Sequence, residues 1–242
     1  MPQPVSKCME GIGGYFPKIP DELSEPASVR AAVASIISDG HTIDAMVLNA
    51  GIMALPERTL HHGQELQFLT NHVGHFILAT GLLGQLAPNG RVVVLSSSAH
   101  QMAPRAGIRL DDLTFEKGYQ AWSSYGQSKL ANLLFARELS RRLPAGQVAN
   151  AVHPGVISTN LGRHMNRFMN GSLRALGPLF LKTIPQGAAT QVWAAVHPDT
   201  ATVTGEYLAD CNVAKSTRLG RDGDLARRLW ARTEEIVGAL GD

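Results

Sequence analysis

The sequence has few cysteines, no long apolar run and almost no excess of charge of one sign. Cys8 and Cys211 are its two cysteines, and neither belongs to a CxxC or to a Cys/His spacing typical of a metal site. No stretch approaches the roughly 18 apolar residues that a membrane-spanning helix needs. The 22 basic and 20 acidic residues leave a net charge of +2. These absences argue against a disulfide scaffold, a membrane span and a nucleic-acid partner.

The amino terminus also lacks the features of a targeting signal. Residues 1–19 contain early prolines and glycines and no apolar core of a secretory signal. Together with the scarcity of cysteine, this predicts a cytoplasmic protein. A chain of 242 residues, 44% of them hydrophobic, can bury a substantial core, and we expect one domain over residues 1–242.

Helix-like and strand-like segments alternate from residue 24 onward. Strand 91–96 is apolar on both faces, as strands of parallel sheets are, and Ser24 is expected to cap the first helix. The alternation predicts an α/β fold with a doubly wound, Rossmann-like parallel sheet. We expect helices over 24–37, 64–86, 119–143, 186–196 and 224–239, and strands over 43–48, 91–96, 147–152 and 206–208. Segment 159–185 is either an apolar lid or a helical hairpin of the core.

Tyr125 and Lys129 are the pair most suggestive of chemistry. They lie four residues apart on a predicted helix, which places both side chains on one face. A nearby ammonium favours the phenolate and is expected to lower the tyrosine pKa, making Tyr125 a useful acid or base. The pair can equally be an ordinary exposed helix pair, so its weight depends on its context.

Other polar residues occupy positions where a site can form. Ser96, Ser97 and Ser98 follow a buried strand, and Asn71 lies inside an apolar helix, where its amide must find a hydrogen-bond partner. The strand that ends at His153 leads into the turn 154–159. Four further histidines, His61, His62, His72 and His75, have no carboxylate or cysteine at ligand spacing in the sequence. We therefore expect no metal site and assign these histidines to the helix surface or the core. Trp193 and Trp230 fall in amphipathic helices, where we expect them in the core rather than as ligand platforms.

Taken in order, these residues resemble the short-chain dehydrogenase/reductase family. More narrowly, the chain looks like the branch that contains retinol dehydrogenases and WW-domain oxidoreductases. The resemblance covers residues 24 to the end. The stretches that carry it are 49–51 (NAG), 95–100 (LSSSAH), 111–113 (DDL), 128–132 (SKLAN), 153–156 (HPGV), 205–207 (GEY) with 210–211 (DC), and 228–230 (RLW).

The resemblance implies hydride transfer between NAD or NADP and a small apolar alcohol, aldehyde or ketone. Tyr125 would be the acid/base, Ser97 would orient the substrate oxygen, and Lys129 would bind the nicotinamide ribose. Asn71 would hold a water in a proton relay to Lys129. The remaining cofactor contacts would come from Asn49, Ala50 and Gly51 along the adenosine ribose, and from Pro154, Gly155, Val156, Ile157 and Thr159 near the nicotinamide amide and phosphate. Many such proteins form oligomers through the helices corresponding to 64–86 and 119–143.

The start of the chain departs from this family. A βαβ unit with a glycine-rich phosphate turn needs about 30 residues, and residues 1–23 are too few to hold it before the predicted first helix. Residues 9–14 (MEGIGG) resemble that turn only faintly, because Pro17 and Pro20 forbid a long helix behind it. We expect residues 1–23 to be a degenerate remnant, with 15–19 left from a strand. The sheet is then incomplete at its amino-terminal side, and strand 43–48 becomes an apolar edge.

Three hypotheses follow from this departure. The chain is an oxidoreductase whose cofactor binding is weakened or completed from outside, or a catalytically impaired pseudoenzyme that acts as a binding module. In the third, the natural protein begins upstream with the unit that is missing here. Cofactor binding separates the first two, and the upstream reading frame tests the third.

Overall fold

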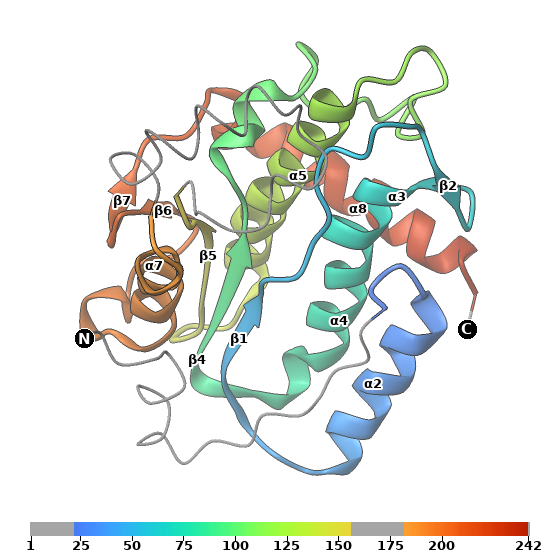
Figure 1. Cartoon of the computed structure of the whole chain (residues 1–242). Coiled ribbons are helices and arrows are strands. Elements are labelled where there is room, and N and C mark those ends of the chain that lie inside the picture. The colour runs from blue at the N-terminus through green and yellow to red at the C-terminus, as the bar shows by residue number, and fades with distance from the viewer. Residues whose placement is uncertain (1–21, 156–181, 242) are drawn as a thin grey trace.

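A computed structural model describes residues 22–155 and 182–241, which form a mostly parallel sheet with helices on both sides (Figure 1). The helices are α2 (Pro26–Ser38), α3 (Leu66–Phe68), the π-helical turn η1 (Leu69–Val73), α4 (Gly74–Leu82), α5 (Ala121–Arg142), α7 (Ile184–Val196) and α8 (Gly223–Ala239), with short 3₁₀ helices η2 (Leu83–Gln85), η3 (Ser98–Met102), η5 (Pro198–Thr200) and η6 (Leu219–Arg221). The strands are β1 (Ile43–Leu48), β2 (Leu60–His61), β3 (Gln64–Glu65), β4 (Leu86–Leu95), β5 (Val148–His153), β6 (Tyr207–Ala209) and β7 (Asn212–Ala214). The predicted α/β fold is confirmed.

The main sheet has the order β1-β4-β5-β6-β7, and its first four strands are parallel. β7 returns antiparallel to β6 through a turn in which Asp210 and Cys211 both have positive φ. Within the described residues β1 forms one edge of this sheet, as the sequence predicted. Its Met46 and Leu48 are buried on one face, whereas Val47 on the other face is 43% exposed. The predicted remnant strand 15–19 lies outside the described residues.

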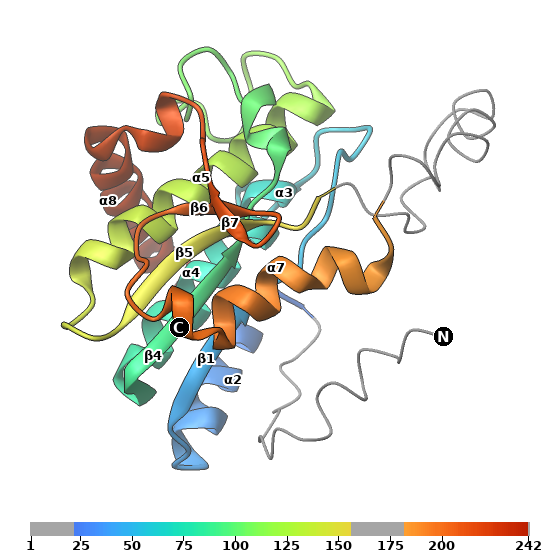
Figure 2. The same ribbon diagram turned by 90° about the vertical axis from the view of Figure 1, so that its left-hand side faces the viewer.

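Figure 2 shows that α5 and α8 lie on one side of the sheet and α7 lies on the other. This arrangement explains why β4 is apolar on both faces. Val92 and Val94 join the large core beneath α4 and α5, and Val93 joins a smaller cluster with Val152, Ala194 and Leu208 beneath α7. Side chains alternate along a strand, so one run of valines contributes to two cores.

Several predicted element boundaries were wrong. The helix expected over 64–86 is interrupted, because Gln64 and Glu65 pair in a hairpin with β2 and the following helix changes to a π-helical turn at Leu69. β4 begins at Leu86, so the residues expected to end that helix lie within a strand that has an irregular register against β1. The first helix is not capped by Ser24, because the N-cap residue is Glu25 and its side chain makes no cap.

The terminal helix α8 covers α5 through Trp230. Its indole is 6% exposed, stacks on Phe135 at 5.6 Å between ring centroids and meets Phe76 edge-on at 4.8 Å. The Arg142 guanidinium lies over the same indole at 4.1 Å. α8 therefore covers part of the surface of α5. Oligomer formation through the helices expected over 64–86 and 119–143 stays a prediction.

We expect Trp230→Ala to lower the free energy of unfolding by about 3–5 kcal/mol, because it removes the aromatic group that docks α8. Trp122→Ala is a matched control: Trp122 is 44% exposed, and its loss should cost less than about 1 kcal/mol. Urea unfolding of both variants measures the difference. Equal losses would show that Trp230 does not carry the docking of α8.

Candidate active site

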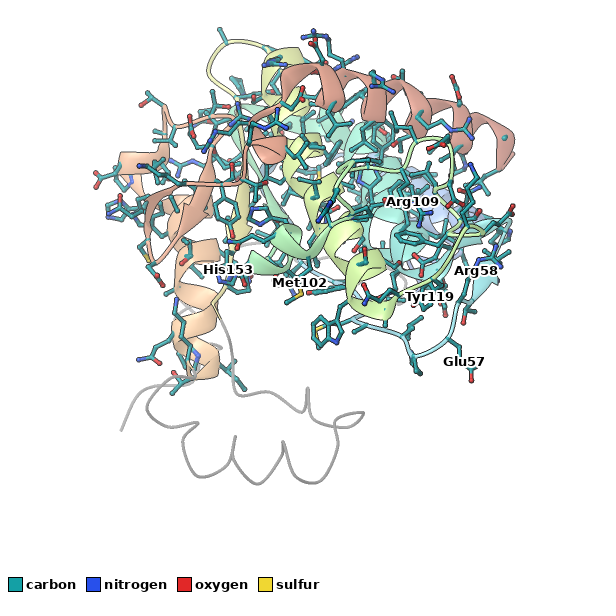
Figure 3. All side chains as sticks on the ribbon, turned by 90° about the horizontal axis from the view of Figure 1, so that it is seen from above. Glu57, Arg58, Met102, Arg109, Tyr119 and His153 are labelled. Atoms are coloured by element: carbon teal, nitrogen blue, oxygen red, sulfur yellow. The ribbon has the colours of Figure 1, made fainter. Side chains whose placement is uncertain are left out.

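The carboxyl ends of β1, β4 and β5 meet at one end of the sheet, because parallel strands run in the same direction. Figure 3 looks onto this end, where it labels Met102, which follows β4, and His153, which ends β5. The amino-terminal half of α5 passes beside these segments and brings Tyr125 and Lys129 to the same place. Segments far apart in the sequence therefore form one polar cluster.

Asn71, which lies in η1, joins the loop after β1 to α5. Its Oδ1 accepts a hydrogen bond from the Ile52 amide at 2.8 Å, and its Nδ2 donates to the Ile52 carbonyl at 2.9 Å and to Ser128 Oγ at 2.9 Å. Asn71 is completely buried, and these bonds satisfy both N–H groups of its amide. A Cβ on Gly51 would lie 2.8 Å from Asn71 Oδ1. Glycine at position 51 therefore permits the close approach of this loop.

Lys129 is almost entirely buried beside Asn71. Its Nζ donates to the Leu95 carbonyl at 3.3 Å and lies 5.7 Å from the centroid of the Tyr125 ring. A Cβ on Gly51 would be 3.5 Å from the same Nζ, so the ammonium also approaches the end of β1. Burial lowers the pKa of Lys129 to about 8, because the charged form is poorly solvated there.

The three serines after β4 have separate positions. Ser96 is buried, and its hydroxyl donates to the Lys129 carbonyl at 2.7 Å, which fixes β4 against α5. Ser97 is half-buried and accepts from the Ala99 amide at 3.2 Å at the start of η3. Ser98 is exposed, and its amide donates to Nδ1 of His153 at 3.3 Å. Of the three, Ser97 is the serine whose hydroxyl interacts with Tyr125.

The predicted lowering of the Tyr125 pKa is wrong for this structure. Burial raises the pKa of Tyr125 above its ordinary value of 10, and the hydrogen bond with Ser97 opposes this rise only in part. Desolvation outweighs the expected effect of Lys129, whose ammonium lies beside the ring rather than bonded to the phenol oxygen. Tyr125 is therefore a protonated acid at neutral pH.

The structure describes only some of the other residues that were predicted to contact the cofactor. Asn49, Ala50 and Gly51 are exposed at the end of β1. Pro154 and Gly155 follow β5, and Gly155 has a φ of +86°. A Cβ there would also lie 2.5 Å from Lys182 Cδ, and the Lys182 ammonium pairs with Asp210. Three predicted contacts lie outside the described residues: Val156, Ile157 and Thr159. The same is true of most of segment 159–185 and of the glycine-containing stretch 9–14.

Comparisons with known proteins agree with this geometry. The sequence matches the family described as Enoyl-(Acyl carrier protein) reductase over residues 3–210. Short-chain dehydrogenase TIC 32 A, chloroplastic, from Brassica napus is 40% identical over 229 residues, and the match covers 90% of this chain and 71% of that protein. Retinol dehydrogenase 14 from Homo sapiens is 38% identical over 238 residues, covering 96% of this chain and 69% of that protein. The chain belongs to the short-chain dehydrogenase/reductase family.

Solved structures extend the family assignment to the fold. A crystal structure from Mycobacterium Paratuberculosis superimposes with a TM-score of 0.68 at 33% identity and covers 89% of this chain and 73% of that one. A blue fluorescent protein from a metagenomic library, crystallised in complex with NADPH, superimposes with a TM-score of 0.59 at 28% identity, covering 77% of this chain and 71% of that one. The short-chain dehydrogenase/reductase family consists of NAD(P)-dependent oxidoreductases.

Sequence reasoning missed two groups in this short-chain dehydrogenase/reductase site. Ser128 receives the Asn71 amide and donates to the Tyr125 carbonyl at 2.8 Å, so it couples η1 to α5. His75 is buried, its Nδ1 is paired with the Asn71 carbonyl at 2.9 Å, and burial lowers its pKa to about 4. A histidine four residues after a buried asparagine was the available signal. The sequence analysis assigned His75 to the helix surface or the core, and it lies in the core.

We expect Gly126→Ala to lower the free energy of unfolding by about 1–3 kcal/mol, because a Cβ there would lie 2.7 Å from backbone atoms of Ala99, Met102 and Ala103. The clash is with the segment that follows Ser97. Gly238→Ala is the control, since a Cβ in that helix meets nothing within 4 Å and should leave stability unchanged or slightly higher. Chemical denaturation compares the two, and a neutral Gly126→Ala would contradict this packing.

Proposed function

We propose that this chain interconverts an apolar alcohol and its carbonyl compound with NAD or NADP, through Tyr125, Lys129, Ser97 and Asn71. The observation that supports the proposal is that these four side chains, from η1, α5 and the segment after β4, come together at the carboxyl end of the sheet. Asn71 bonds Ser128, Lys129 lies beside Tyr125, and Ser97 interacts with the same tyrosine. A cytoplasmic location, argued from the sequence, is part of the same proposal.

The described residues fit the nicotinamide half of a cofactor. Lys129 keeps N–H groups beyond the one that bonds Leu95, and an ammonium of this kind can donate to ribose hydroxyls. Gly51 lets the loop after β1 pack closely on Asn71 and Lys129, since a Cβ there would lie 2.8 Å from Asn71 Oδ1 and 3.5 Å from Lys129 Nζ. A bound nicotinamide cofactor supplies the hydride. Residues 22–155 and 182–241 contain no glycine-rich turn that leads from a strand into a helix, so contacts to the pyrophosphate must come from elsewhere.

The catalytic steps assigned to the protein are proton transfer and orientation. Ser97 holds the substrate oxygen by a hydrogen bond, and the Tyr125 hydroxyl gives it a proton during carbonyl reduction. In the reverse direction Tyr125 accepts the proton and must first be ionised. Because its pKa is raised, Tyr125 is protonated near neutral pH, which is the form that carbonyl reduction requires. Lys129 contributes a positive charge beside this exchange.

An apolar substrate is supported by the surface around Tyr125. Trp122 is 44% exposed and meets the Tyr125 ring edge-on at 6.1 Å between centroids, and Met102 is 54% exposed. A cluster of exposed apolar side chains at a polar site is a recognition feature. The name of the human relative, Retinol dehydrogenase 14, points to the same chemical class.

We expect Tyr125→Phe to reduce turnover of a hydrophobic aldehyde by at least about 100-fold while fold and cofactor binding change little, because only the transferable proton is lost. Ser97→Ala should reduce turnover in the same way. Ser96→Ala is the matched control, since its hydroxyl bonds the Lys129 carbonyl and does not interact with the phenol. Steady-state kinetics measures all three. Unaltered turnover in Tyr125→Phe would remove this residue from its role.

Cofactor binding should weaken as the pH rises through about 8. The pKa of Lys129 is lowered to about 8, so its ammonium is present below that pH and lost above it. Titration of Tyr125→Phe with NADPH between pH 6.5 and 9.5 tests this without interference from the phenol. The same titration of Tyr125→Phe/Lys129→Met should show weaker binding without this pH dependence. An identical fall in both proteins would assign the pH dependence to another group.

A binding module without catalysis is the second candidate. Its support is β1, which is the edge strand of the described sheet and leaves Val47 43% exposed. Unpaired strand edges bind other chains. The same cofactor titration separates the two functions. A folded chain that binds neither NADH nor NADPH is not an autonomous dehydrogenase, and one that binds a cofactor and reduces an aldehyde is an enzyme.

A further inference from the structure

Glu25, His61 and His62 form a compact cluster away from the proposed chemistry. Nε2 of His61 lies 2.5 Å from Oε1 of Glu25, and Nε2 of His62 lies 2.9 Å from Oε2 of the same carboxylate. One potential ligand atom from each residue lies within 4.8 Å of the other two. Sequence spacing did not indicate this cluster, because Glu25 is 36 residues from His61. The premise that no carboxylate joins these histidines is therefore wrong for the folded chain.

The local fold aims both imidazoles at the same carboxylate. His61 pairs with Gln64 across the β2–β3 hairpin, and the turn between them consists of His62 and Gly63, with φ of 48° and 72°. Positive φ at both central residues is the geometry of a tight hairpin turn. The two rings meet edge-on at 4.3 Å between centroids. The hairpin therefore presents two nitrogen donors side by side.

The two parts of the cluster are held by the core. On the helix side, a Cβ on Gly74 would lie 2.2 Å from the carbonyl oxygen of Leu23, two residues before Glu25. The start of α2 therefore packs tightly on α4. On the hairpin side, Glu65 is completely buried and accepts from the Phe68 amide at 2.9 Å. Little chain freedom remains between Glu25 and the imidazoles, so the donors are arranged before any ligand arrives.

We infer that Glu25, His61 and His62 bind a divalent transition-metal ion of the Zn²⁺ class. Two imidazole nitrogens and one carboxylate oxygen are a donor set that zinc takes, with water in the fourth position. Tetrahedral bonds of roughly 2.0–2.2 Å separate neighbouring ligand atoms by about 3.3 Å. The imidazole nitrogens lie 2.5 and 2.9 Å from different oxygens of the Glu25 carboxylate, and one ligand atom from each residue lies within 4.8 Å of the other two, so small side-chain movements reach this spacing.

The cluster is reachable and its place in the fold gives the ion a structural role. The side chains of Glu25, His61 and His62 are 41, 41 and 39% exposed, so an ion can enter from solvent. A metal there would join the start of α2 to the hairpin that leads through α3 into η1, which carries Asn71. The ion would thus brace the segment before the proposed active site and take no part in hydride transfer.

The test uses the full chain, stripped of metal, and Zn²⁺ alone as the probe. Calorimetric titration should show binding of one Zn²⁺ per chain, and Zn²⁺ should raise the melting temperature. Glu25→Gln, His61→Gln and His62→Gln should each weaken binding by at least about tenfold. His197→Gln is the matched control, because His197 is an exposed histidine 3.6 Å from a single carboxylate, Asp199, and its loss should leave binding unchanged.

Substitution with Co²⁺ adds a readout that does not depend on stability. A four-coordinate site with nitrogen and oxygen ligands should give visible absorption bands that His61→Gln/His62→Gln loses. Circular dichroism checks that each variant is folded, and Glu25→Gln and His62→Gln, which alter a helix start and an exposed turn, decide the matter if His61→Gln does not fold. Absence of zinc binding by the wild type, or equal binding by the double variant, would overturn the assignment and leave two ordinary His–Glu hydrogen bonds.

Discussion

The hydrogen bonding of Asn71 is the constraint on which the site depends. A buried amide costs several kcal/mol unless its donors and acceptor are used, and here the partners come from the loop after β1 and from α5. The helix around Asn71 adopts a π-helical turn, in which the chain gains a residue relative to the α-helix. Gly51 allows the loop after β1 to approach Asn71, and Lys129 lies beside Gly51 and Asn71. These contacts hold the end of β1, η1 and α5 in fixed positions relative to one another.

Burial determines the electrostatics of this site more than pairing does. Lys129 has its pKa lowered to about 8 and Tyr125 has its pKa raised, and desolvation is the main cause of both. Each group is shifted toward its neutral form. The site is therefore prepared to donate a proton from Tyr125 near neutral pH, and a cofactor that brings negative charge would restore the cationic form of Lys129.

Much of the fold was predictable from hydrophobic periodicity. β1 has the bounds that the sequence predicted, and α5 differs from its predicted range by only two residues at its start and one at its end. The interrupted helix after residue 64 was not predictable, because a hairpin and a π-helical turn arise there from contacts with Glu65 and Asn71 rather than from local propensity. The gathering of Asn71, Ser97, Tyr125 and Lys129 was inferred from a family resemblance. The joining of Glu25 to two histidines had no sequence signal at all.

The central claim is that this chain reduces an apolar carbonyl compound, with Tyr125 giving the proton and a nicotinamide cofactor supplying the hydride. The most direct measurement is mass spectrometry of the alcohol formed when the purified chain is incubated with a hydrophobic aldehyde and NADPH deuterated at both C4 positions, with NADH tested in parallel. The account predicts one deuterium on the carbinol carbon of the product. A folded chain that yields no deuterated alcohol with either cofactor would contradict it.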